Sequence, residues 1–382
     1  MPPRKSLKAM PMLHQPNNPP ASSWDRLAST SLMPSACHSR TWLEPMFEHF
    51  RHHNAKLITP DNTPLQAVAS LDHVTLPGGI RLPIAQTWDN GYLFSGTPLI
   101  SADNPQAALV NLLSAARSQM NVGAVLFRKV QRHEIFEQIL QQVHKQSDIA
   151  GFRLFNSHQR AALQCHHEFD HWFNENFSRK RRKEYRRLRN RFAETGNLQS
   201  LTWQPCDPVE QWIEEFLLLE AAGWKGRHGT AIASNSEQTA QLRHALPQMA
   251  QNGSLLFWKI TLDDKPVASM FGFLEQDQVW LGKMAYDETL SQFSPGVLVI
   301  LDATRDLLTR KDITLADSSA DPDHPMINNI WRDRLPVADY LIATPGTSQT
   351  KFKALTTLYS ARLQARQLAK TAYHKIRKGL KK

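Results

Sequence analysis

The sequence predicts an α+β protein with two domains, and three observations indicate this class. The chain has 382 residues, which is long for one hydrophobic core and comfortable for two. Residues 254–286 hold three apolar, β-prone runs separated by short acidic turn clusters, as in an antiparallel meander. Residues 297–308 then have the apolar spacing of a helix, and residues 313–319 return as a short strand. We therefore expect a mixed, mostly antiparallel sheet flanked by helices.

The connection between the third strand and the helix contains a Ser-Pro-Gly turn. Gly296 lets a ligand approach the backbone, Pro295 presets a helical φ, and the free N–H groups of a new helix attract an anion. This pattern predicts a site for a phosphate-bearing cofactor, although it is also a common way to begin a helix. The residues that we expect to contact the cofactor are Gln292, Ser294, Pro295, Gly296 and Val297.

The N-terminal part has a different composition. Residues 1–38 contain seven prolines and no sustained periodicity, so we expect a flexible leader. The first domain is predicted at 39–160, where a helical pattern at 104–119 is followed by a strand-like run at 122–130. This order repeats the helix and strand of residues 294–317, which suggests a duplicated fold.

Two basic segments stand out from a chain of net charge +10. Residues 179–191 hold nine Lys or Arg and one Glu, and residues 360–382 hold eight with no acidic residue. We expect the first segment to lie within the second domain, at 161–345, and the second to belong to a basic amphipathic tail, at 346–382. Such segments suit an anionic partner, whether a nucleic acid, a membrane surface or a phosphorylated cofactor.

Composition also bears on the cellular compartment of the protein and on whether it binds a metal. The three cysteines are far apart, and no apolar run approaches the length of a membrane span, so we expect a soluble, cytoplasmic protein. His167 and His171 have helical spacing within a His- and acid-rich segment, but no second cluster at ligand spacing completes a metal site. We therefore expect no metal.

A further candidate region follows the basic segment. Residues 209–222 have a helical apolar stripe, and Gly223 ends the predicted helix before a Trp-Lys-Gly-Arg turn. Glu220 from the helix, and Trp224, Lys225 and Arg227 from the turn, should therefore meet where the helix end joins a loop. The alternative is a structural role, in which the Trp224 indole covers an edge of the core and the charged side chains are solvated.

Several blocks, taken together, resemble a known family. The blocks are LEAAGWKGRHGTA, KMAYDETLSQFSPGVL and DPDHPMINNIWRDR, with TWLEPMFEHF, TWDNGYLFSGTPLI and RKRRKEYRRLRNRFAETG before them. They are similar to the GNAT-superfamily acetyltransferases called CelD-like or BioF2-like over roughly residues 41–340. The resemblance implies two tandem GNAT-like domains, arranged as in the FemABX aminoacyl transferases, with the acyl donor in the second domain. It implies acetyl-CoA as the donor and an amine on a small molecule, saccharide or peptide as the acceptor.

Acyl transfer to an amine requires a base, polarisation of the thioester carbonyl and a proton for the leaving thiolate. A backbone N–H of the strand at 278–286 is expected to polarise the carbonyl. The expected catalytic residues are Lys283, Asp287, Tyr286 and Glu220, with Lys283 and Asp287 preferred because they come from one strand end beside the predicted phosphate turn. The alternative is a Lys-Asp pair on the surface, since strand alternation places positions 283 and 287 on the same face. The residues expected to bind the acceptor are Trp224, Lys225, Arg227, Asp317, Asp323, His324, Trp331 and Arg332.

Two other functions remain open at this point. Better-studied GNAT enzymes have a glycine-rich pyrophosphate loop, whereas Pro295 removes one N–H donor here. A FemABX-type transferase that uses aminoacyl-tRNA would employ the same double fold and hold RNA through the basic segments. A non-catalytic protein that binds nucleic acid or an anionic membrane through a degenerate GNAT scaffold is the remaining alternative.

Overall fold

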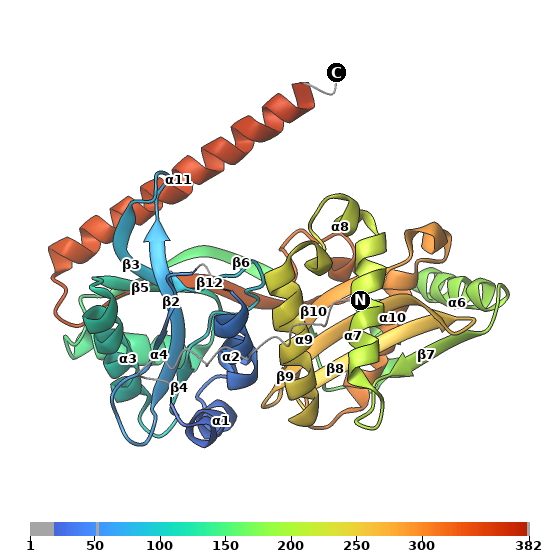
Figure 1. Cartoon of the computed structure of the whole chain (residues 1–382), viewed down its shortest axis with the longest axis horizontal. Helices are drawn as coiled ribbons and strands as arrows, with labels where there is room; N and C mark the ends of the chain where they lie inside the picture. Colours follow the sequence, from blue (N-terminus) through green and yellow to red (C-terminus); the bar gives the residue numbers. More distant parts are fainter. Residues whose placement is uncertain (1–18, 51–52, 380–382) are drawn as a thin grey trace, which may run out of the picture.

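One sheet of twelve strands runs through the computed structural model, which describes residues 19–50 and 53–379 (Figure 1). The strand order is β1-β2-β3-β5-β12-β6-β11-β10-β9-β8-β7, and β4 pairs with β2. The strands are β1 (Lys56–Ile58), β2 (Ala67–Thr75), β3 (Arg81–Thr87), β4 (Leu99–Ile100), β5 (Ala124–Gln131), β6 (Phe152–Gln164), β7 (Leu198–Thr202), β8 (Leu255–Leu262), β9 (Lys265–Glu275), β10 (Gln278–Tyr286), β11 (Leu315–Asp317) and β12 (Asp333–Ala343).

Helices cover this sheet. The α-helices are α1 (Ala21–Thr30), α2 (Arg40–His49), α3 (Pro105–Met120), α4 (Glu134–Lys145), α5 (Phe169–Asn176), α6 (Arg179–Ala193), α7 (Val209–Ala222), α8 (Trp224–Arg227), α9 (Ser236–Gln251), α10 (Pro295–Thr309) and α11 (Gln349–Gly379). Short 3₁₀ helices are η1 (Ala36–His38), η2 (Ile232–Ser234), η3 (Glu288–Phe293) and η4 (Ile327–Asn329). None of the helices that the described residues form combines the length and apolar character that a membrane crossing requires.

The predicted meander and the predicted duplication are confirmed. Strands β8, β9 and β10 pair antiparallel in succession, and β10 pairs parallel with β11 after the crossover through α10. In the N-terminal half β3 pairs parallel with β5 after the crossover through α3. Both crossover helices have Pro as their first residue, where its fixed φ suits a helix and its missing N–H costs no hydrogen bond. The chain therefore consists of two halves that repeat the same helix and parallel crossover.

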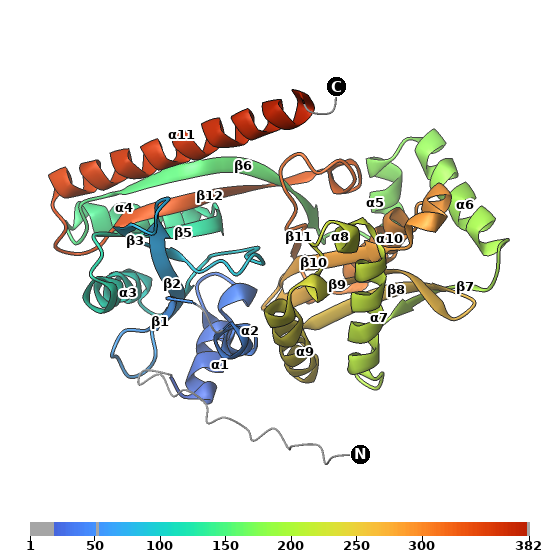
Figure 2. The same cartoon turned by 45° about the horizontal axis from the view of Figure 1, so that its top comes forward.

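The two halves share strands. The long strands β6 and β12 pair with each other and run from one half into the other (Figure 2). The C-terminal part of β12, from Val337 to Ala343, pairs with β5 of the N-terminal half, while the end of β6 pairs with β11 of the C-terminal half. The structure therefore differs from the predicted C-terminal domain at 161–345. The last strand of that range, β12, pairs with β5 in the part of the sheet that belongs to the N-terminal half.

The predicted tail forms α11, and its apolar stripe is buried. Phe352, Leu355 and Tyr359 lie in the hydrophobic cluster of the N-terminal half, whereas most residues of the following turns are exposed up to Ala372. Figure 2 shows α11 lying along β6 and extending past the N-terminal half. The stripe attaches the helix to the first half, although the helix follows the second half in the sequence.

The expected leader needs correction for residues 19–38. Residues 21–30 form α1, and Trp24 is fully buried, with its indole N–H donating to the carbonyl of His38 at 2.9 Å. Trp24 joins a cluster with Trp42 of α2 and Phe273 of β9, so this segment fills the space between the halves. Its prolines suggested disorder, but the apolar side chains between them are enough to pack it. The earlier part of the expected leader lies outside the described residues.

Candidate functional site

A cavity of about 450 Å³ lies beside the C-terminal part of β10. The end of α7, the short helix α8 and the segment after β11 form its other walls. It is lined by six residues that the sequence analysis selected: Glu220, Trp224, Lys225, Lys283, Tyr286 and His324. Expected catalytic groups of α7 and β10 therefore meet in one pocket, although they are far apart in the sequence.

Glu220 lies at the centre of the charged part of this cavity. Its side chain is fully buried, and one carboxylate oxygen, Oε2, accepts a hydrogen bond from the Ile232 N–H at 2.8 Å. The other oxygen, Oε1, lies 3.4 Å from the Nζ atoms of both Lys225 and Lys283. Two ammonium groups therefore share one carboxylate, and removing one proton would leave a balanced ion pair.

Lys283 is the lysine whose surroundings favour the neutral form. Only 24% of its side chain is exposed. Burial lowers the pKa of Lys283 because it removes water from the ammonium group; Glu220 opposes this effect and the nearby Lys225 adds to it. Lys225 is held differently, since its Nζ also donates to the Met284 carbonyl at 2.9 Å.

The strand that carries Lys283 is irregular at this point. The pairing of β10 with β9 shifts register between Leu281 and Met284, which is a β-bulge. Gly282 is required there, because a Cβ atom would lie 2.3 Å from the Phe271 ring. A bulge leaves a residue outside the ladder and redirects its neighbours, and Gly282 and Lys283 have no partner in the register with β9.

The N-terminal half also reaches this site, through Tyr92 in the loop between β3 and β4. Lys283 Nζ lies 5.1 Å from the centre of the Tyr92 ring, and the ring packs against Trp42. The Tyr92 hydroxyl is buried without a hydrogen-bond partner in the described part of the chain. Burial raises the pKa of Tyr92 well above its ordinary value, and the charge of Glu220 adds to the effect. The sequence analysis missed Tyr92, although its segment TWDNGYLFSGTPLI was one of the family-like blocks.

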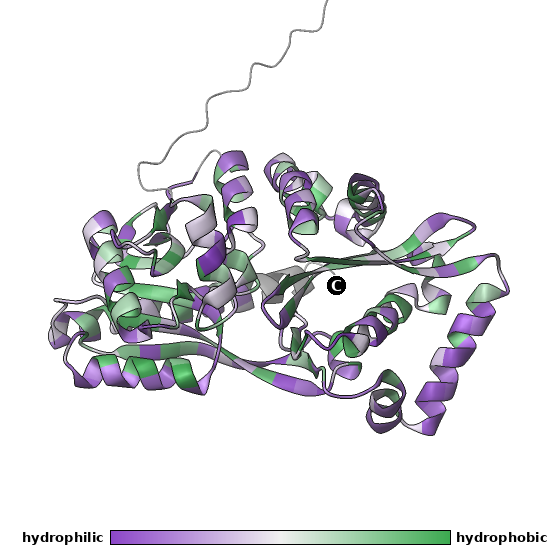
Figure 3. Cartoon of the chain, turned by 90° about the horizontal axis from the view of Figure 1, so that it is seen from below, coloured by the Kyte–Doolittle hydropathy of each residue, from purple (hydrophilic) through white to green (hydrophobic). Residues whose placement is uncertain are grey.

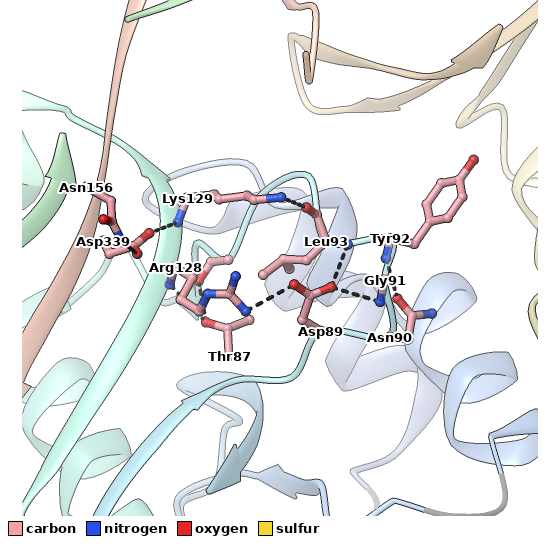
Figure 4. Close-up of polar contacts among 11 residues, drawn as sticks. Thr87, Asp89, Asn90, Gly91, Tyr92, Leu93, Arg128, Lys129, Asn156 and Asp339 are labelled. Carbon is pink, nitrogen blue, oxygen red and sulfur yellow. Dashed lines mark hydrogen bonds and ion pairs between the residues drawn. The ribbon is translucent and has the colours of Figure 1, made fainter. Parts of the chain in front are cut away.

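Polar contacts hold the Tyr92 loop in place (Figure 4). Asp89 accepts hydrogen bonds from the N–H groups of Gly91 and Leu93, at 2.9 and 3.4 Å, and pairs with Arg128 at 3.0 Å. Lys129 Nζ donates to the Leu93 carbonyl at 2.6 Å. The loop is therefore anchored to β5, and its position does not depend on Tyr92 alone.

Lys129 is itself fixed by the shared strands. Its backbone N–H donates to Asp339 of β12, and Asn156 of β6 donates to the other oxygen of that carboxylate (Figure 4). Lys129 and Asn156 both have positive φ, and the pairings of β12 with β5 and with β6 shift register beside Asp339. The two bulges thus hold the Tyr92 loop relative to both halves.

Asp287 does not join the cavity, contrary to the prediction. Strand β10 ends at Tyr286, so strand alternation does not extend to Asp287, which instead caps η3. Its Oδ1 accepts from the backbone N–H and the hydroxyl of Thr289, at 2.9 and 2.7 Å. The next residue, Glu288, lines the cavity and pairs with Arg227 of α8. Arg227 therefore serves to hold the rim rather than to line the cavity.

The predicted phosphate turn adjoins the cavity without lining it. A Cβ atom at Gly296 would lie 3.0 Å from the Tyr286 ring and 3.2 Å from Met284 Cε, and both of these residues line the cavity. The N–H groups of Val297 and Leu298 already donate to the Ser294 carbonyl, at 2.9 and 3.2 Å. Since Pro295 has no N–H, the first turn of α10 offers few donors to a phosphate, while Gln292 is exposed nearby.

The expected acceptor-binding residues divide into three groups. His324 lines the cavity, and its Nδ1 faces the N–H groups of Met326 and Ile327, at 3.3 and 3.4 Å; burial lowers its pKa. Asp323 and Arg332 are exposed and do not line the cavity.

Asp317 and Trp331 are structural, which corrects the prediction. Asp317 forms a buried ion pair with Arg160 of β6 at 2.6 Å, and each side chain is only 3% exposed. Arg160 also donates to the Phe94 carbonyl in the Tyr92 loop at 3.0 Å. The Trp331 indole is fully buried and donates to the Thr304 hydroxyl at 2.9 Å. The sequence pattern cannot distinguish a carboxylate or an indole that faces a ligand from one that faces the core.

Comparison with known proteins gives one family match, which covers part of the chain. Residues 179–320 match the family model described as an acetyltransferase (GNAT) domain, and this range contains Glu220, Lys283 and the turn before α10. A sequence comparison with curated proteins gives no match.

Several solved structures share the fold over most of both chains. FemX is 11% identical, with 89% of this chain and 98% of that chain covered and a TM-score of 0.57. The C-terminal domain of a putative lysylphosphatidylglycerol synthetase from Agrobacterium fabrum is 11% identical, with 88% and 94% covered and a TM-score of 0.52. A conserved protein of unknown function from Bacteroides thetaiotaomicron is 13% identical, with 85% and 97% covered and a TM-score of 0.51. At these low sequence identities, the similarity shows a shared fold alone.

Proposed function

We propose that this chain, whose fold is similar to that of FemX and whose residues 179–320 match a GNAT domain, is an acyltransferase that moves an acyl group from acyl-CoA to an amine acceptor. The observation that carries this proposal is the buried Lys225–Glu220–Lys283 arrangement in a cavity beside the β10 bulge. Its charges suit an acyl transfer in which the amine attacks the thioester directly. Within the superfamily, the family-like blocks favour the CelD-like or BioF2-like group.

Lys283 is the general base in this mechanism. In its neutral form it accepts the proton that the amine loses as the new C–N bond forms. The remaining Lys225–Glu220 pair is then balanced, which favours the deprotonated state of Lys283 before the reaction. Glu220 is a positioning residue, since its oxygen holds both lysines near the reacting amine.

Strand β10 would polarise the carbonyl and supply the proton for the leaving thiolate. A backbone N–H freed by the bulge near Gly282 would donate to the carbonyl oxygen as negative charge develops there. The C–S bond breaks as the tetrahedral intermediate collapses, and Tyr286, which lines the cavity, would give a proton to the leaving thiolate. The acceptor amine would enter past Trp224, whose side chain is 49% exposed at the rim.

The test is calorimetric titration of the full chain with acetyl-CoA, followed by an assay of thiol release with a panel of amines. Gln292→Glu is the informative variant, because Gln292 is exposed and the new charge would repel a phosphate without repacking. Gly296→Glu would instead displace the Tyr286 ring. We expect saturable binding that Gln292→Glu weakens at least several-fold. A folded chain that binds no acetyl-CoA would contradict the proposed donor.

A second donor is favoured by a specific observation. The first turn of α10 offers few N–H groups, whereas α6 presents exposed cations without an ion pair among the described residues, at Arg179, Lys180, Lys183 and Arg186. The helix at the right edge of Figure 3 is α6, and it is hydrophilic along most of its length. It packs beside η3, where Phe192 stacks on Phe293 at 4.7 Å. An aminoacyl-tRNA donor, as in FemABX-type transfer, would use these cations.

Salt dependence distinguishes the two donors. If RNA is bound through α6, its affinity should fall steeply with salt, and replacing Lys180 and Lys183 by Gln should reduce this slope by about one for each phosphate that is no longer bound. Transfer from acetyl-CoA that is insensitive to these changes would exclude the RNA donor. Steep salt dependence without any transfer would favour a non-catalytic nucleic-acid or membrane-surface protein. A soluble, cytoplasmic location remains part of the proposal for both enzymes.

A further inference from the structure

Three side-chain atoms of metal-binding type converge where α2 contacts α9, at the junction of the two halves. His49 Nε2 lies 3.1 Å from His244 Nδ1, and Glu48 Oε2 lies 3.4 Å from the same nitrogen. All three ligand atoms lie within 4.8 Å of one another. The sequence analysis expected no metal, because no second cluster at ligand spacing completes a site, whereas His49 and His244 are 195 positions apart in the chain.

If the two imidazoles are neutral and hydrogen-bonded to each other, only one hydrogen lies among these three atoms. If His244 Nδ1 carries a lone pair, that lone pair faces the Glu48 carboxylate, which repels it. If His244 Nδ1 carries a proton, one hydrogen must serve both the carboxylate and a lone pair on His49 Nε2. In the second case the shared hydrogen makes one bifurcated hydrogen bond. One divalent cation between them would accept a lone pair from each atom.

The distances fit a metal polyhedron. Zn²⁺ bonds to imidazole nitrogen and carboxylate oxygen are about 2.0–2.2 Å, so neighbouring ligands of a tetrahedral ion are ~3.4 Å apart. The two measured separations, 3.1 and 3.4 Å, lie close to this value. Two imidazoles and one carboxylate are a common ligand set for zinc, and the fourth position is then filled by water. His244 is one-third exposed, with 33% of its side chain accessible, so an ion has an entry path.

We propose that Glu48, His49 and His244 bind one Zn²⁺ ion, which joins α2 of the N-terminal half to α9 of the C-terminal half. The same helix α9 already contacts the loop that carries Tyr92, because Asn90 Nδ2 donates to Gln241 and Gln238 donates to the Asn90 carbonyl, at 2.8 and 3.1 Å. The ion would therefore add a link from α9 to the N-terminal half about one helical turn beyond its contacts with this loop. Its role is structural, since it lies outside the residues that line the cavity.

The chain offers an internal control. His167, His171 and Glu175 also bring ligand atoms within 4.8 Å of one another, but all three are exposed and lie in one short segment around α5. His171 already pairs with Glu175 at 3.2 Å, one turn away on the helix. This group spans no junction between elements of the two halves, so an ion there would add no link between them.

The test is titration of untagged, chelator-stripped full chain with Zn²⁺ by calorimetry, with a thermal melt at each metal ratio. We expect one high-affinity site and a rise in melting temperature that saturates at one equivalent. His244→Ala and His49→Gln should each lower the Zn²⁺ affinity at least tenfold and remove the rise, whereas His171→Ala should change neither. Two ligand variants are used so that a folding defect in one does not decide the result.

Three outcomes overturn the inference. The first is a wild-type chain that binds no Zn²⁺ at micromolar concentrations. The second is binding that both ligand variants retain, or that His171→Ala removes, because the ion would then lie elsewhere. The third is a site at these residues whose occupation leaves the melting temperature unchanged, which would exclude a link between the halves. None of these outcomes bears on the proposed acyl transfer, so the two proposals fail separately.

Discussion

Lys283 shows how the position of one side chain changes its chemistry. An exposed lysine is protonated at neutral pH and is a poor base. Here the ammonium lies against the Tyr92 ring, shares Glu220 with Lys225 and is shielded from most of the surrounding water. The same residue at the end of an exposed strand would be a surface cation.

This environment predicts the pH dependence of the reaction. Because burial lowers the pKa of Lys283, the neutral base forms at a lower pH than for a lysine in water. We expect kcat/KM to rise with pH and to level off clearly below pH 10.5, and Lys283→Met to lower it by about 10²–10⁴-fold. Pre-steady-state and steady-state rates across the neutral and alkaline range provide the measurement. A profile that Lys283→Met leaves unchanged would assign the base elsewhere.

A buried histidine predicts a stability effect. His38 is fully buried, its Nδ1 lies 3.2 Å from the Ser35 hydroxyl, and burial lowers its pKa from 6.5 to about 4. Between about pH 6.5 and pH 4 the unfolded chain binds the proton and the folded chain does not, so stability falls as the pH falls. The loss is at most ~1.4 kcal/mol per pH unit, about 3 kcal/mol in all. Denaturant titrations across this range should show a flatter dependence for His38→Gln.

Among the elements, α1 illustrates how a few apolar residues order a segment of low periodicity. Trp24 brings one indole into the cluster between the halves, where its N–H finds a carbonyl partner. Burial of Trp24, together with Leu27 and Ala28, offsets part of the entropy that this short helix loses.

The contribution of α1 can be measured by truncating that indole. Trp24→Ala should lower the free energy of unfolding by about 3–5 kcal/mol, because it leaves a cavity and an unpaired carbonyl. The matched control is Trp224→Ala, which removes an indole that is 49% exposed and should change stability little. Equal effects of the two substitutions in urea denaturation would mean that α1 is not packed as described.

The Tyr92 loop is the second element on which the site depends. Asp89 accepts two backbone hydrogen bonds and one ion pair. Asp89→Ala should therefore destabilise the protein by about 2 kcal/mol and lower kcat, while acetyl-CoA affinity stays near the wild-type value. Asp103→Ala is the control, since Asp103 is an exposed acidic residue in the same half. A similar decrease of kcat in both variants would contradict a specific role of the Tyr92 loop in catalysis.

The whole molecule is held together by strands that belong to both halves. Strands β6 and β12 continue one sheet across the junction, and the buried Arg160–Asp317 pair joins β6, β11 and the Tyr92 loop. The site thus contains groups from both halves.

Breaking that ion pair should weaken the entire fold. Asp317→Asn leaves the Arg160 charge buried without its partner, which costs about 3–5 kcal/mol. Asp323→Asn, at an exposed position, should cost almost nothing. The double variant Arg160→Met with Asp317→Leu should recover part of the stability, because no unpaired charge remains. Additive effects in chemical denaturation would contradict a direct coupling of the two side chains.

The amino-acid sequence by itself determined the local elements. Apolar, β-prone runs predicted β8 to β10, Pro at the first position predicted the start of α10, and the amphipathic tail predicted at 346–382 forms α11. Glu220 and Lys283 were also identified, because both lie at the ends of strongly patterned elements. Periodicity reports local geometry, so these features need no knowledge of distant contacts.

Only the tertiary structure decided which distant residues meet. It brought Tyr92 to Lys283, turned Asp317 inward to Arg160, and placed His49 beside His244. It also moved the end of β12 into the N-terminal sheet and left Asp287 as a turn cap. The physical reason is that the sequence does not indicate where a charged or aromatic side chain will point. Its neighbour in the folded chain can be solvent, the core or a ligand.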